Sequence, residues 1–367
     1  MGSQKIYRGW HFFVARVIAT ANCDQNFSVV FHKKDAYTHP IQRAPGSSKP
    51  KNFDAEFSLI GIDAAIANAF RRILIAEVPT LAIEDVFIFN NTSIIQDEVL
   101  AHRLGLIPLT GNPDGLNWLL WRKKEVKDES DDSAIPTELN TVVLNLNIDC
   151  TWKEDGRQLA RRGEADPQKL YNHSNVYAKD MVFQAQGRQN EIFSEKNGKI
   201  EPVNPDILIA KLRPGQSINL QMHCVKGVGA DHAKFSPVCT ASYRLLPSIN
   251  IISPIVGADA RKFARCFPKG VIGLEPASRA EIEQAGGKEG DSKAVVLDPM
   301  KDTVSRECLR HAEFKDKVKL GRVRDHFIFR VESTGQFESD ELFLESVRLL
   351  KAKCKLVKKG LENMHRG

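Results

Sequence analysis

Hydrophobic and polar positions alternate strictly along several parts of this chain, and each such part predicts a strand with one buried face. The clearest examples are NFDAEFSLIG (52–61), TVVLNLNID (141–149), SINLQMHC (217–224) and DHFIFRVEST (325–334). The first of them places Phe53, Ala55, Phe57 and Leu59 on one face. Residues 80–245 show mainly this two-residue period, so we expect that region to be rich in strands.

A helical period follows the first strand, in IDAAIANAFRRILIAEVP (62–79). Asp63 is a natural N-cap for this helix, because its carboxylate can accept hydrogen bonds from the free amides of the first turn. We predict a helix from about 63 to 77, ended by Pro79. The helix is apolar nearly all round, and the adjacent Arg71 and Arg72 are almost its only charges. A solvated helix carries scattered charges, so this pattern needs a reason.

Other segments give simpler expectations. QDEVLAHRLG (96–105) predicts a short helix with acidic residues near its positive end and Gly105 as C-cap. The charge-dense RKKEVKDESDDS (122–133) is interpreted as a solvated connector, and residues 1–50 as an extended arm. Residues 268–303 are rich in Gly, Pro, Lys and Glu, so we expect an insertion or a mobile loop there.

The chain closes with SDELFLESVRLLKAKCKLVKKGLENM (339–364), which predicts a long helix with Ser339 as N-cap. Its apolar residues recur at alternating steps of four and three, a 3.5-residue period typical of a seam against another long helix. The seam positions are Phe343, Val347, Leu350, Cys354, Val357, Leu361 and Met364. The seam faces the 63–77 helix, a second chain, or both. The alternative is an ordinary amphipathic helix on its own core.

Composition changes this picture little. At 367 residues the chain is long enough for two lobes, and 42% hydrophobic with 27% charged residues is ordinary for a globular protein. The net charge of +6 falls short of a dedicated DNA-binding surface. The seven cysteines are scattered and never form CxxC, which favours a reducing compartment. No stretch has the length of a membrane span and the start has no signal-peptide layout, so we expect a soluble, intracellular protein.

No segment carries a convincing active site. HCVKGVGADHAKFSPVC (223–239) contains two histidines and two cysteines, but His223 and Cys224 are adjacent and point to opposite faces of a strand. Tight pairs of metal ligands are absent. The GVGADH within it lacks the Gly-Lys-Ser/Thr ending of a phosphate-binding loop, and no carboxylate pair suggests acid–base catalysis. We therefore expect no metal, no cofactor and no catalytic residue.

Three blocks of the sequence resemble the alpha-like subunits of multisubunit RNA polymerases. The first spans residues 62–109, ends in DEVLAHRLGLIPL, and includes Asn68, Arg71, Arg72, Glu77 and Pro79. The others are KLRPGQSINLQMHCVKGVGADHAKFSPV (211–238) and FRVESTGQFESDELFLESVRLL (329–350). The resemblance covers most of residues 53–250 and 322–350, which is too much for chance.

Within that family, the sequence is similar to the larger alpha-like subunit shared by eukaryotic RNA polymerases I and III. The RNA polymerase II counterpart carries zinc-binding cysteines soon after GLIPL, whereas residues 109–139 of this chain contain no cysteine. Archaeal relatives sometimes hold iron–sulfur clusters near the position of 255–320. Only Cys266 and Cys308 fall there, too few for a four-cysteine cluster.

The resemblance implies an α+β fold with a discontinuous dimerisation lobe. Residues 1–79 and 242–367, from both chain ends, would form that lobe, and residues 80–241 would form an inserted strand-rich lobe. The 63–77 helix would lie between a smaller alpha-like partner and the second-largest polymerase subunit. Arg72 is the expected large-subunit contact, because guanidinium groups bind carboxylates or carbonyls bidentately. The expected interface residues are Ile66, Phe70, Arg71, Arg72, Ile73, Phe343, Val347, Leu350, Cys354 and Val357.

The resemblance also implies the function. The chain would be a non-catalytic assembly platform of RNA polymerases I and III, which transcribe rRNA, tRNA and 5S RNA in the nucleolus and nucleoplasm of the nucleus. It would heterodimerise with a smaller alpha-like subunit and then dock the second-largest subunit and small zinc-binding adaptor subunits. It would touch nucleic acid only indirectly and bind no membrane.

Two alternatives stay open at this point. One is the alpha-like subunit of another multisubunit polymerase, RNA polymerase II or an archaeal enzyme, and the missing cysteine cluster counts against it. The other is an enzyme with an unfamiliar site, and the missing catalytic motifs count against that. The sequence does not distinguish polymerase I from polymerase III.

Overall fold

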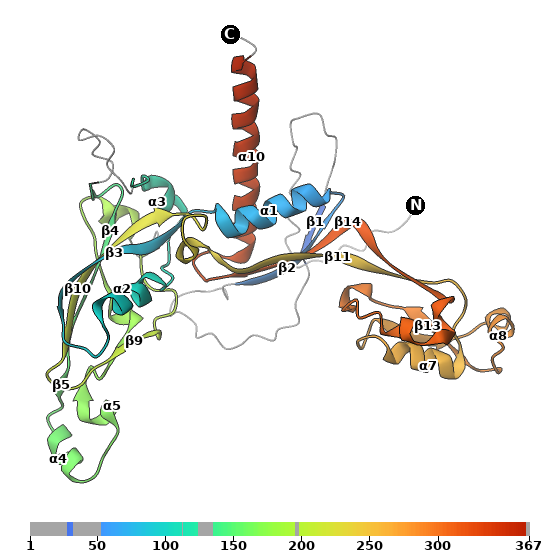
Figure 1. The fold of residues 1–367 in the computed structure, drawn as a ribbon, viewed down its shortest axis with the longest axis horizontal. Coiled ribbons are helices and arrows are strands. Elements are labelled where there is room, and N and C mark those ends of the chain that lie inside the picture. Colours follow the sequence, from blue (N-terminus) through green and yellow to red (C-terminus); the bar gives the residue numbers. More distant parts are fainter. Residues whose placement is uncertain (1–27, 32–52, 112, 124–134, 195–197, 365–367) are drawn as a thin grey trace. The chain divides into compact units, whose positions relative to one another are not determined.

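The chain adopts a mixed α/β fold (Figure 1). The computed structural model describes residues 28–31, 53–111, 113–123, 135–194 and 198–364. These residues divide into two compact units. The first contains 28–31, 56–68 and 242–330, and the second contains mainly 69–241 and 331–364. Within the described residues, no helix combines the length and the apolar character that crossing a membrane requires.

A four-stranded sheet organises the first unit. Its strands lie in the order β1 (Ser28–Phe31), β2 (Asp54–Ile60), β14 (Val318–Ser333) and β11 (Val238–Ile251). β1 and β2 are antiparallel, with Ser28 opposite Ile60. The alternation predicted for β2 is confirmed, because Ala55, Phe57 and Leu59 are buried. Phe57 stacks on Phe329 of β14 with ring centroids 5.5 Å apart, so strands from early and late parts of the chain share one core.

The predicted 63–77 helix is α1 (Ala64–Ala76), which follows β2. Asp63 caps it as expected. Its carboxylate accepts the Ala65 N–H at 3.1 Å, and its carbonyl accepts the Ala67 N–H at 3.1 Å. After the helix, Pro79 leads directly into β3 (Thr80–Asn91), because proline cannot continue a helix.

Residues 268–303 are folded, so the expectation of a mobile loop was wrong, whereas the alternative of an insertion stays a prediction. β12 (Ile272–Pro276) and β13 (Ser292–Val296) pair in an antiparallel hairpin, with α8 (Arg279–Ala285) between them. Beside the hairpin lie α7 (Gly257–Arg265), η4 (Pro299–Lys301), η5 (Glu307–Arg310) and α9 (Ala312–Lys315). Together these elements bury a cluster of apolar side chains that includes Phe263, Val271 and Phe314. Each of the two strands has only five residues, so an alternation in sequence is too short to detect.

A second four-stranded antiparallel sheet organises the second unit. Its strands lie in the order β3, β10 (Ser217–Gly227), β4 (Val142–Asp149) and β8 (Val182–Gln184). The predicted alternation is confirmed, because Leu144, Leu146, Leu220 and Met222 are buried together on one face. α2 (Asp97–Gly105) adds Leu100 and Leu104 to this core.

Short elements complete the second unit. They are α3 (Pro113–Trp118), β5 (Thr151–Trp152), α4 (Gly156–Arg161), α5 (Pro167–Leu170), β6 (Tyr171–Asn172), β7 (Asn175–Tyr177), η2 (Ala178–Asp180), α6 (Gln189–Ile192), β9 (Leu208–Lys211) and η3 (Ala233–Phe235). β5 pairs with β6, and β7 pairs with β9. The helices among them are too short to show a period in sequence. Most of the predicted connector and arm lies outside the described residues.

The cap residues of two helices differ by one position from their prediction. Gly105 is the last residue of α2, and the cap is Leu106, whose right-handed conformation (φ −88°, ψ −2°) requires no glycine. The closing helix, α10, runs from Ser339 to Met364 as predicted. Its first hydrogen bond comes from the Leu342 N–H to the Glu338 carbonyl at 3.1 Å, so the N-cap position falls on Glu338 and not on Ser339.

The glycine-rich loop after β10 is explained by packing. A Cβ on Gly229 would lie 2.2 Å from the Ile75 carbonyl oxygen of α1. The next residue, Ala230, donates its N–H to the Ala76 carbonyl at 2.8 Å. The loop therefore satisfies a carbonyl at the end of α1, and only glycine allows this approach.

We expect Gly229→Ala to lower the free energy of unfolding by about 1–3 kcal/mol, because a backbone carbonyl cannot move aside as a side chain does. Gly360→Ala in α10 is the matched control. Its new Cβ would meet nothing within 4 Å, and higher helix propensity should stabilise the chain by up to about 1 kcal/mol. Urea unfolding of both variants measures the difference, and equal effects would contradict this account of Gly229.

Candidate partner interface on α1 and α10

The predicted interface residues of α1 divide between interior and surface. Phe70 and Ile73 are buried, and Ile66 is more than one-third exposed. Arg71 is half-buried, whereas Arg72 is exposed. The apolar stripe of α1 is therefore covered at its C-terminal part, and Arg72 is the charge that the helix presents to solvent.

The seam of α10 changes character along the helix. Phe343 is 2% exposed and packs edge-to-face against Phe70 of α1, with ring centroids 5.4 Å apart. Val347 and Leu350 are half-buried. Cys354 is exposed, Val357 is 64% exposed, and Leu361 and Met364 are exposed as well. The same stripe thus begins inside the core and continues over open surface.

An ion pair marks the point where the packing ends. Lys353 of α10 meets the carboxylate of Glu77, just after α1. Both side chains are partly exposed, so we expect this pair to contribute at most about 1 kcal/mol to stability. Every residue of α10 from 351 to 364 is exposed. An exposed apolar stripe of this length is typical of a surface that binds another macromolecule.

Sequence reasoning found the seam but missed two features of this surface. Leu356 is 70% exposed and lies about 100° around the helix from Val357, so α10 also exposes an apolar side chain on a side other than the seam. The Lys353–Glu77 pair joins positions 276 residues apart, and no local pattern indicates it.

The histidine and cysteine side chains that first suggested chemistry lie apart. His223 packs edge-to-face on Phe87 at 4.7 Å, and burial lowers its pKa. Cys224 is fully buried on the other face of β10, where burial raises the pKa of its thiol. The His232 ring accepts the Lys234 N–H at 3.1 Å, and the Cys239 thiol lies 3.9 Å from the Ser333 carbonyl. Within the described ranges, no group of three His, Cys, Asp or Glu residues is arranged to hold a metal ion.

The two cysteines among the described residues of the first unit, Cys266 and Cys308, are also buried. Burial raises the pKa of Cys266, and it raises that of Cys308 to about 11. Burial thus disfavours the thiolate form of both side chains, and the thiolate is the form that acts as nucleophile and metal ligand. The structure gives them a packing role.

A family comparison identifies the fold. Residues 56–354 match the family described as the RNA polymerase Rpb3/Rpb11 dimerisation domain. The chain belongs to this family. The predicted resemblance to alpha-like polymerase subunits is therefore confirmed, and the matched range includes α1 and most of α10.

Individual relatives refine the comparison within the Rpb3/Rpb11 family. The chain is 54% identical over 310 residues to DNA-directed RNA polymerases I and III subunit RPAC1 of Saccharomyces cerevisiae, which covers 83% of each chain. It is 48% identical over 300 residues to the human protein of that name, covering 82% of this chain and 79% of the relative. Identity to the Dictyostelium discoideum RNA polymerase II subunit rpb3 is 30% over 311 residues, 83% and 89% of the two chains.

In the chain without a partner, replacing a side chain by alanine should lower the free energy of unfolding much more in the first half of α10 than in the second half. Phe343→Ala removes a buried ring from its contact with Phe70 and should lower the free energy of unfolding by about 3–5 kcal/mol. Val357→Ala should change it by less than about 0.5 kcal/mol, because that side chain is exposed. Urea titration of the unpartnered chain tests both, and similar losses would show that the second half of α10 packs on its own chain.

Proposed function

We propose that this chain is the larger alpha-like subunit shared by DNA-directed RNA polymerases I and III, and that it acts in assembly without an active site of its own. The observation that carries the proposal is the 54% identity to the yeast subunit over 83% of both chains. The lower identity to an RNA polymerase II subunit and the lack of cysteine in residues 109–139 disfavour RNA polymerase II. No residue constellation described above favours the rival proposal of an enzyme.

The first assembly step in this proposal is heterodimerisation with the smaller alpha-like subunit. Its surface is the exposed second half of α10, where Cys354 and Val357 continue the stripe that begins at Phe343. The dimerisation lobe would comprise residues 1–79 and 242–367, and residues 80–241 would be the inserted strand-rich lobe. The sheet that joins β1 and β2 with β14 and β11 supports a lobe made from both parts of the chain.

The second step is docking of the second-largest polymerase subunit, followed by small zinc-binding adaptor subunits. The exposed Arg72, on the otherwise apolar α1, is the contact proposed for the large subunit. The half-buried Arg71 precedes it directly in sequence, and the partly exposed Ile66 lies on the same helix. The assembled enzymes would act in the nucleus, including the nucleolus, and produce rRNA, tRNA and 5S RNA.

Val357→Asp should weaken the heterodimer by about 3 kcal/mol, roughly a hundredfold in Kd, because it would bury an unpaired carboxylate in the partner interface. Ala352→Asp is the matched control. Ala352 is also exposed, but it lies about 140° away around the helix and outside the seam. Co-purification with the smaller alpha-like subunit measures the effect. Loss of the partner from both variants, or from neither, would exclude the seam as the interface.

Arg72→Glu should leave the heterodimer intact and abolish docking of the second-largest subunit, because it reverses charge where a cation is expected. The measurement is a pair of pull-downs on one variant, with the small partner and with the large subunit. Arg348→Glu, on an exposed position of α10 outside the seam, controls for the charge change. Retention of the large subunit at wild-type salt resistance would remove Arg72 from the proposed contact.

A further inference from the structure

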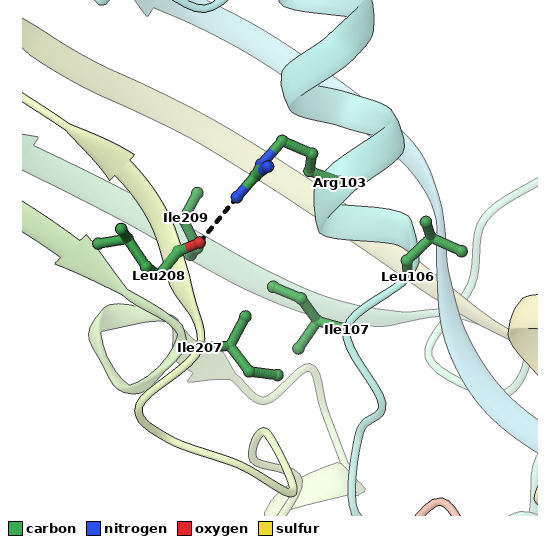
Figure 2. A pocket seen from close by; sticks show the side chains of 6 residues that line it. All are labelled: Arg103, Leu106, Ile107, Ile207, Leu208 and Ile209. Atoms are coloured by element: carbon green, nitrogen blue, oxygen red, sulfur yellow. Dashed lines mark hydrogen bonds between the residues drawn. The ribbon is translucent and has the colours of Figure 1, made fainter. Parts of the chain in front are cut away.

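A small pocket lies in the second unit between α2 and the chain around β9, apart from the residues assigned to the two docking steps. Figure 2 shows its six lining residues: Arg103, Leu106, Ile107, Ile207, Leu208 and Ile209. Its volume is about 230 Å³. The motif DEVLAHRLGLIPL, which ends the first block of the family resemblance, supplies three of these residues, and the proposed function leaves them without a role.

One wall of the pocket is the outward side of α2. Leu100 and Leu104 face the core and are fully buried. Arg103 and Leu106 are three residues apart, which places them on a common side of the helix end. Both are exposed, and Leu106 keeps 52% of its surface in solvent. The helix therefore presents a cation and an aliphatic group side by side.

The opposite wall holds the arginine in place. The Arg103 guanidinium donates a hydrogen bond through Nη2 to the Leu208 carbonyl at 2.9 Å (Figure 2). A guanidinium has five N–H donors, so one such bond fixes its direction and leaves others for a ligand. Within the part of the chain that the structure describes, Arg103 forms no ion pair. No carboxylate among these described residues therefore pairs with its positive charge at the pocket rim.

The rest of the lining is aliphatic. Ile107 and Ile209 are buried and form the floor, and Ile207 and Leu208 are half-buried. No aromatic ring is present for stacking on a base, and the volume is below the range of about 300–1,000 Å³ that small-molecule sites have. The pocket thus suits one or two branched aliphatic side chains next to one anionic group.

We propose that this pocket docks a segment of another subunit in which an aliphatic side chain stands beside an Asp or Glu carboxylate. The aliphatic group would fill the space over Ile107 and Ile209, and the carboxylate would meet Arg103. Charge complementarity favours an acidic segment, because Arg103 is the one charged side chain among the six described lining residues. The proposal rests on the proposed function only in that this chain works inside a larger assembly.

Peptide binding to the purified heterodimer tests the chemistry. The probes are two fluorescein-labelled, amidated peptides, Gly-Gly-Leu-Glu-Gly-Gly and its Leu-Gln counterpart, followed by fluorescence anisotropy at low salt. We expect the Leu-Glu peptide to bind at least about tenfold more tightly, because a charge-assisted hydrogen bond replaces a neutral one. Equal binding of the two peptides, or binding of neither, overturns the proposal. A failure of the proposed function is distinct, since the heterodimer itself would then not form.

Three variants test whether Arg103 causes the preference for the Leu-Glu peptide over the Leu-Gln peptide. Arg103→Glu should abolish it, and Arg103→Lys should keep part of it, because lysine retains the charge without the fork of donors. Arg162→Glu, the same charge change at the exposed C-cap of α4, should leave the preference unchanged. Circular dichroism melts confirm that each variant is folded. A Glu preference that survives Arg103→Glu in a folded protein overturns the assignment.

Photo-cross-linking in the whole polymerase tests the occupant. p-Benzoylphenylalanine in place of Leu106 should cross-link to one peptide that contains an aliphatic residue next to Asp or Glu, and Arg103→Glu should remove that cross-link. The control position is Leu120, which is also exposed and lies outside the pocket. A cross-linked peptide without a carboxylate, or no cross-link beyond that from position 120, overturns the proposal.

Discussion

The closing helix α10 is longer than the surface that packs against it, and this mismatch determines which apolar side chains stay exposed. α10 runs from Ser339 to Met364, about 39 Å at 1.5 Å per residue. The contact between Phe343 and Phe70 anchors its beginning, and the Lys353–Glu77 pair marks the end of its packing. Its apolar stripe continues past that point over exposed surface. Apolar area left in water costs free energy, so we expect a partner to cover the stripe.

The unusual composition of α1 follows from the same constraint. Its residues Phe70, Ile73 and Leu74 are buried, and placing a charge among them would carry a large desolvation cost. The helix can keep cations only where they reach its margin, as the half-buried Arg71 and the exposed Arg72 do. The positions of the two arginines are therefore set by burial, and Arg72 is the one whose side chain is exposed to solvent.

Local pattern predicted the elements whose burial is periodic over many residues. β2, β4, β10, α1 and α10 are of this kind, and Asp63 capped α1 as its side-chain chemistry indicated. The β12–β13 hairpin escaped prediction because its five-residue strands acquire their buried face only by packing with Phe263 and Phe314, distant in sequence. The pocket at Arg103 was not predicted either, because it too is formed by contacts between separate segments of the chain. Its defining bond joins residues 105 positions apart, and neither strand nor helix signals it alone.

The two proposed recognition surfaces, the second half of α10 and the Arg103 pocket, differ in how much binding free energy each can supply. The second half of α10 offers a long, nearly continuous apolar stripe, and extensive apolar burial is typical of interfaces that stay assembled. The Arg103 pocket holds little more than one side chain, so it is too small to retain a subunit alone. Its directed cation instead distinguishes an acidic segment from a neutral or basic one, since a mismatched charge there would be left unpaired. The helix would thus supply most of the binding free energy, and the pocket would select which segment docks beside it.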